Sequence, residues 1–89
     1  MNPIIKRAGH KETFDERKLY ASIYAAALVN HRHEETAELI AALAIKTIKQ
    51  WMKKKKEITS EQLAKETVRT LKRIDREVAY LYETHRDIA

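Results

Sequence analysis

The residues best suited to bind an anion lie within the first eighteen positions of the chain. Lys6 and Arg7 are adjacent cations just before Gly9, and Lys18 follows near the beginning of a predicted helix. Paired cations suit phosphate groups, because charge-assisted hydrogen bonds to phosphate are among the stronger polar contacts in proteins. Gly9 can adopt the positive φ that a tight turn needs. We therefore predict a phosphate site in an N-terminal hairpin.

Two short strands, residues 4–7 and 11–14, form this hairpin in our interpretation. Successive side chains of a strand point to opposite faces, so one of Lys6 and Arg7 should face the rest of the domain. A basic side chain turned inward is costly without an anion beside it. The alternation thus favours a bound anionic ligand.

Apolar periodicity predicts four helices after the hairpin. Asp15 is a good N-cap for the first, and residues 30–33 break the pattern before a second helix over residues 34–54. Residues 57–58 read as an extended piece, a candidate third strand. Thr59 followed by Gln62 resembles a capping box that opens the third helix, and Asp75 is expected to cap the fourth.

The apolar faces of the four helices define the expected core, and no linker divides them. We predict one mainly α (α+β) domain over residues 1–89: a four-helix bundle capped by a two- to three-stranded sheet from the N-terminal hairpin. The predicted core residues are Leu19, Ile23, Ala26 and Ala27; Ile40, Leu43, Ala44, Ile45, Ile48, Trp51 and Met52; Leu63, Thr67, Val68 and Leu71; and Val78, Leu81, Tyr82, His85 and Ile88.

Composition narrows the class of protein. Of the 89 residues, 44% are hydrophobic and 35% charged, a balance typical of a folded domain. The absence of cysteine excludes disulfides and thiolate zinc sites and favours a reducing compartment. No apolar run approaches the roughly 20 residues that span a membrane, and the first residues lack the apolar core of a signal peptide. We therefore expect a cytoplasmic protein without a membrane partner.

The net charge of +5 is compatible with a polyanionic partner. Lysines at positions 53–56 and Lys49 suggest an alternative function, a basic nucleic-acid-binding or helical adaptor module. Apart from Trp51 this run lacks interleaved aromatic residues, so nucleic acid is the weaker prediction. His31 and His33 do not suffice for a metal site, and no nucleophile–base set or Walker motif is present. We therefore predict that the chain is not an enzyme.

The order of these residues resembles a known family. The opening Ile5-Lys6-Arg7-Ala8-Gly9, Glu12-Thr13-Phe14-Asp15 and Lys18-Leu19 is similar to the start of an ATP-cone domain. The continuation is similar as well, in Ile58-Thr59-Ser60-Glu61-Gln62-Leu63 and in Val78-Ala79-Tyr80 with Tyr82, His85 and Arg86. The resemblance covers essentially the whole chain and implies a helical bundle under a small sheet that binds ATP or dATP.

The resemblance also implies site residues. Lys6 and Arg7 match a basic pair at the triphosphate, Glu12 and Asp15 lie near the adenine, and Lys18 lies near ribose and phosphates. Leu19 and Ile23 are expected in the base pocket, Thr59 and Ser60 at the helix N-terminus, and Arg86 near the phosphates. Simpler roles compete, because Asp15 and Thr59 are good caps and core packing also explains Leu19 and Ile23.

The family's function implies a non-catalytic regulatory module. Adenine nucleotide would change the oligomeric state of the domain, or the activity of a regulated protein such as a ribonucleotide reductase. Any Mg²⁺ would arrive with the nucleotide. Ala8 replaces a common family aspartate, and Ala64 stands where some members carry a histidine near the sugar. The preference between ATP and dATP is therefore left open.

Overall fold

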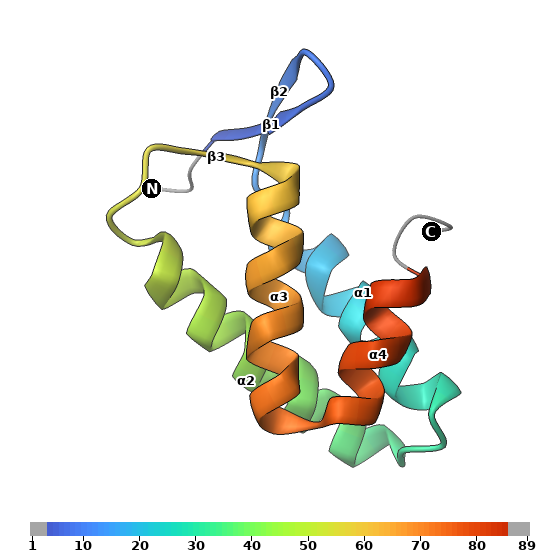
Figure 1. Ribbon diagram of the computed structural model, residues 1–89. Coiled ribbons are helices and arrows are strands. Elements are labelled where there is room, and N and C mark those ends of the chain that lie inside the picture. The colour runs from blue at the N-terminus through green and yellow to red at the C-terminus, as the bar shows by residue number, and fades with distance from the viewer. Residues whose placement is uncertain (1–3, 86–89) are drawn as a thin grey trace.

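The computed structural model describes residues 4–85, without the side chains of Arg7 and His85. Within this range four helices lie beneath a three-stranded sheet (Figure 1), which confirms the predicted fold class. None of these helices is both long and apolar enough to cross a membrane. The elements are β1 (Ile4–Arg7), β2 (His10–Thr13), α1 (Glu16–Val29), α2 (Glu34–Met52), β3 (Glu57–Thr59), α3 (Ser60–Ile74) and α4 (Arg76–His85).

The sheet has the strand order β2-β1-β3, so the candidate third strand is present. β1 pairs with β2 in antiparallel fashion and places Lys6 opposite Lys11. β1 also pairs with β3 in parallel, which places Ile5 beside Ile58 and Lys6 beside Thr59. Ile5 and Ile58 are both 2% exposed and belong to the core, so the face of the sheet that carries them covers the helical bundle. Lys6 lies on the other, outer face because strand side chains alternate.

The hairpin turn consists of Ala8 and Gly9. Their φ angles are 45° and 85°, so both residues occupy the left-handed region. Two consecutive positive φ values are the signature of a type I′ turn, whose twist matches that of paired strands. After this turn, β2 begins at His10, one residue earlier than predicted. Phe14 therefore follows the strand, and it is a buried core residue.

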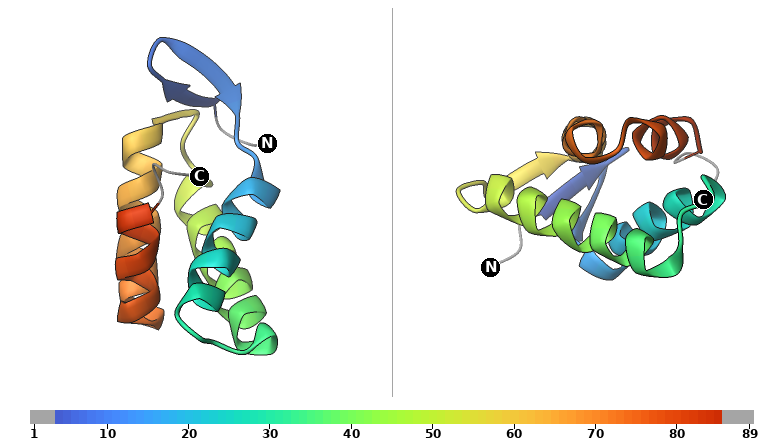
Figure 2. Two further views of the ribbon diagram at one scale, coloured as in Figure 1. Left: turned by 90° about the vertical axis from the view of Figure 1, so that its right-hand side faces the viewer. Right: turned by 90° about the horizontal axis from the view of Figure 1, so that it is seen from below.

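The helices form two antiparallel hairpins packed face to face (Figure 2). α1 packs against α2 and α4, and α3 packs against α2 and α4, which closes a four-helix bundle. The centre of the core is formed by fully buried side chains from all four helices: Ile23, Ile48, Thr67, Leu71 and Val78.

The prediction that Leu43 belongs to the core is wrong. Leu43 is 51% exposed and lies on the solvent side of α2 with Leu39, which is 71% exposed. The buried stripe of α2 instead includes the small residues Ala37 and Ala41, which allow close approach of neighbouring helices. The remaining predicted core residues are buried or partly buried, except that His85 and Ile88 lie outside the described side chains.

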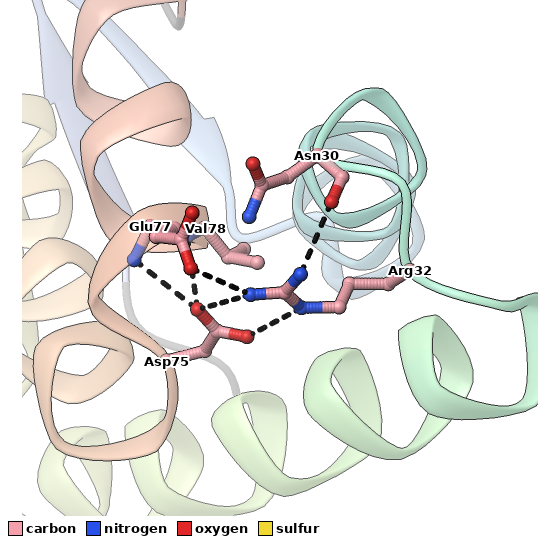
Figure 3. A network of polar contacts seen from close by, with 5 residues as sticks. All are labelled: Asn30, Arg32, Asp75, Glu77 and Val78. Atoms are coloured by element: carbon pink, nitrogen blue, oxygen red, sulfur yellow. Dashed lines mark hydrogen bonds and ion pairs between the residues drawn. The ribbon is translucent and has the colours of Figure 1, made fainter.

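An ion pair joins the two helical hairpins at the end of the bundle away from the sheet (Figures 1 and 3). Arg32, between α1 and α2, donates from Nε to Asp75 Oδ2 at 2.8 Å and from Nη2 to Asp75 Oδ1 at 3.2 Å. Asp75 Oδ1 also accepts from the backbone N–H groups of Glu77 and Val78, which confirms its expected role as the cap of α4. Hydrogen bonds from Arg32 hold the pKa of the Asp75 carboxyl below its ordinary value.

Candidate functional site

The outer face of the sheet carries a cluster of three charged side chains. Glu57 of β3 lies between two lysines, with Oε2 at 3.1 Å from Lys6 Nζ and Oε1 at 3.5 Å from Lys11 Nζ. The Lys6 ammonium is the main cause that lowers the pKa of the Glu57 carboxyl, and Lys11 adds to it. The three side chains remain 38% to 66% exposed, so the cluster faces solvent.

This arrangement bears on the prediction that an inward-facing basic side chain of β1 needs a bound anion. Ile5 takes the inward position of β1, and the Lys6 side chain is half-exposed with an anionic partner of its own. Lys6 therefore needs no ligand to compensate for burial. The backbone of Arg7 ends β1 opposite His10, and its side chain lies outside the described part of the structure.

A second group of predicted residues lies where β2 leads into α1. Asp15 Oδ1 accepts from the Lys18 backbone N–H at 3.2 Å, which confirms the expected N-cap. The side chains of Asp15 and Lys18 are exposed. Glu12 pairs with Ile5 across the hairpin, and its side chain is also exposed. The structure thus presents two carboxylates and a lysine to solvent near the start of α1.

Leu19 and Ile23 follow on the inner face of α1. They are 8% and 0% exposed and belong to the hydrophobic core. Core packing therefore accounts for both side chains, and Ile23 has no surface to offer a ligand without movement of its neighbours. Leu19, one helical turn nearer to the sheet, retains a small exposed area.

The start of α3 lies beside β1. Thr59 Oγ1 accepts from the Gln62 backbone N–H at 3.0 Å, and Gln62 Oε1 accepts from the Thr59 N–H at 2.9 Å. These two bonds form the predicted capping box. Because Thr59 pairs with Lys6, the positive end of the α3 dipole and the Lys6 strand are adjacent. Ser60, the first residue of α3, is partly exposed there.

The predicted site residues therefore fall into two groups, and the register places Glu12 on the inner face of the sheet with Ile5, whereas Lys6 and Thr59 lie on the outer face. Lys6 lies with Thr59 and Ser60 at the β1–β3 side of the sheet, while Glu12, Asp15 and Lys18 lie along β2 and the start of α1. Arg86 lies outside the described residues.

Two members of the charged cluster, Lys11 and Glu57, were not predicted from the sequence. Opposite charges on neighbouring strands are a recognisable signal, but here it depends on a strand register that the sequence does not reveal.

Elsewhere, an open groove of about 260 Å³ lies between α3 and α4. Three cations on α3 and one carboxylate on α4 line it over an aliphatic floor: Lys65, Arg69, Lys72, Glu83, Ala64 and Val68. Ala64 is the position compared above with a family histidine, and it is 8% exposed. Among the side chains that the structure describes, no three histidine or acidic groups gather closely enough to hold a metal ion.

The fold and the site together define a class: a small helical bundle whose covering sheet and helix starts carry exposed cations and carboxylates. A family model described as the ATP cone domain matches residues 3–88. The chain therefore belongs to the ATP-cone family. Domains of this family are non-catalytic, nucleotide-binding regulatory modules that take ATP or dATP as effectors. No solved structure matches the chain.

Proposed function

We propose that this domain binds ATP or dATP at the sheet end of the bundle, and that binding changes its oligomeric state or the activity of a regulated protein such as a ribonucleotide reductase. The observation that carries the proposal is the position of Lys6. Lys6 is an exposed cation on β1, and it pairs with Thr59, the N-cap of α3. A cation and a helix N-terminus both favour phosphate, and here they are adjacent. Family membership supplies the nucleotide class.

The phosphates are assigned to the basic pair Lys6 and Arg7, with Thr59 and Ser60 at the start of α3. Arg86 is proposed as a further phosphate contact on the basis of the family resemblance. A triphosphate carries several negative charges, and an adjacent helix N-terminus stabilises negative charge. Mg²⁺, where present, would arrive with the nucleotide.

The nucleoside is assigned to the junction of β2 and α1. The carboxylates of Glu12 and Asp15 can accept from the adenine amino group, while Lys18 is placed near ribose and phosphates. Asp15 Oδ1 accepts a hydrogen bond from the Lys18 backbone N–H, so we assign the contact with the adenine base to Asp15 Oδ2. Leu19 and Ile23 are proposed to support the base from the core side.

Calorimetric titration with ATP and dATP in parallel tests this function. We expect saturable binding to the wild-type chain and a loss of at least about tenfold in affinity for Lys6→Ala and for Arg7→Ala, because each removes a charge-assisted contact. Lys46→Ala is the matched control, since Lys46 is an exposed lysine on α2. Absence of binding at high micromolar concentration of both nucleotides would contradict the proposal. Light scattering with and without each nucleotide then measures the change in oligomeric state.

A further inference from the structure

Glu57 occupies a position that suits an anion better than a neutral group. Each of its two carboxylate oxygens contacts a different ammonium group, at 3.1 Å for Lys6 and 3.5 Å for Lys11. The two lysines come from neighbouring strands and lie opposite each other in the register. Like charges that face each other across a strand pair repel, so this point of the outer face attracts an anion.

We propose that Glu57 is an internal substitute for phosphate: in the nucleotide-free domain its carboxylate lies between Lys6 and Lys11, and a phosphate group of the bound nucleotide takes that place. The proposal rests on the function proposed above and adds two residues to it. Lys11 becomes a further phosphate-binding residue, and Glu57 becomes a built-in competitor that lowers the affinity for nucleotide.

Exchange of the carboxylate for phosphate is physically reasonable because the cluster is accessible. The side chains of Lys6, Lys11 and Glu57 are 49%, 66% and 38% exposed. Ion pairs at such exposure contribute little to stability, so the carboxylate can leave at small cost. A terminal phosphate has more negative charge and more acceptor oxygens than a carboxylate, so it binds two ammonium groups more strongly. Since the pKa of Glu57 is lowered, the competing carboxylate is ionised at neutral pH.

A purely structural role for Glu57 makes a different prediction. If Glu57 only relieves repulsion between the two lysines, its replacement would lower the free energy of unfolding and leave nucleotide affinity unchanged. If it competes with phosphate, Glu57→Gln tightens binding, because the amide keeps the shape of the side chain and removes the charge. Affinity therefore separates the two roles.

The experiment is calorimetric titration of the full chain with ATP, and with inorganic triphosphate as a probe without a nucleoside. We expect Glu57→Gln to tighten both by about two- to fivefold and Lys11→Gln to weaken both by a similar factor, the upper part of the range for a single exposed charge contact. Lys11→Gln should still weaken binding in the Glu57→Gln background, since Lys11 then contacts phosphate directly. Glu35→Gln and Lys46→Gln are controls with the same changes in net charge on exposed helix positions.

The outcomes are distinguishable. If the wild-type chain and all variants fail to bind ATP, the proposed function fails and this inference fails with it. If the wild-type chain binds ATP but Glu57→Gln matches Glu35→Gln, only the inference is overturned. Thermal unfolding of each variant verifies the fold, and Glu57→Ala provides a second removal of the carboxylate should the amide form new hydrogen bonds.

Discussion

At the scale of single residues, the Arg32–Asp75 and Lys6–Glu57 ion pairs have similar chemistry but differ in exposure. The Arg32 and Asp75 side chains are 28% and 16% exposed and form two hydrogen bonds across the helical hairpins. The Lys6–Glu57 pair is more exposed and bridges neighbouring strands. Since screening by water weakens exposed pairs, Arg32–Asp75 is the pair expected to hold the fold, and Lys6–Glu57 is the pair expected to exchange.

Asp75→Asn should lower the free energy of unfolding by about 2 kcal/mol at neutral pH, because it removes a charge-assisted partner from a partly enclosed guanidinium. The folded-state pKa of Asp75 lies below its unfolded value. Its contribution is therefore fully present above the unfolded pKa of about 4 and is lost as the pH falls through the folded pKa. Urea unfolding of wild type and variant across pH 2 to 7 measures both effects.

Glu77→Gln is the control for that prediction. Glu77 contacts the same guanidinium at 3.3 Å, but its side chain is 73% exposed. We expect a change within about 0.5 kcal/mol, as for most exposed ion pairs. A gap between wild type and Asp75→Asn that stayed constant down to pH 2 would show that Asp75 does not titrate as described.

At the scale of elements, the hairpin turn holds a residue with a Cβ in the left-handed region. Ala8 has a φ of 45° although it carries a Cβ, while Gly9 at 85° has none. The left-handed region costs most residues with a Cβ about 1–2 kcal/mol, and asparagine is the residue other than glycine that adopts it most readily. Ala8 therefore has a strained backbone conformation in this turn.

Ala8→Asn should stabilise the protein by about 0.5 kcal/mol, because Asn-Gly is the preferred sequence of a type I′ turn. Gly9→Ala is the opposite test. A Cβ at Gly9 would meet nothing within 4 Å, so its expected cost of about 1 kcal/mol comes from backbone conformation alone. Thermal unfolding measures both variants, and equal melting temperatures for the two would contradict the assigned turn.

At the scale of the whole molecule, the Arg32–Asp75 ion pair and the proposed binding surface lie at opposite ends of the bundle. The Arg32–Asp75 contact joins the hairpins at one end, and the sheet with its charged cluster covers the other (Figures 1 and 2). α1 and α3 both begin at the sheet end, so their N-termini face the proposed ligand. Signals from nucleotide to partner would then pass through helix packing rather than through the distal ion pair.

This separation predicts that Asp75→Asn lowers stability without changing nucleotide affinity by more than about twofold, because the two features lie at opposite ends of the bundle. Titration at a temperature where the variant is fully folded measures the affinity. Lys6→Ala is expected to show the reverse, with nearly unchanged stability and weakened binding. A large loss of affinity in Asp75→Asn would indicate coupling along the helices.

The sequence by itself determined the parts of this protein that depend on local chemistry. Helix periodicity, the caps at Asp15, Thr59 and Asp75, and the spacing of the hairpin motif are local, so they predicted the four-helix bundle and the ATP-cone family. The tertiary structure decided what depends on register and on contacts between distant segments. Packing of Ile5 on the bundle turns Lys6 outward, and the parallel pairing of β3 with β1 brings Glu57 to it from 51 positions along the chain. No local sequence pattern predicts the Lys6–Glu57 contact, because strand register is set by the packing of Ile5 and Ile58 on the bundle beneath them.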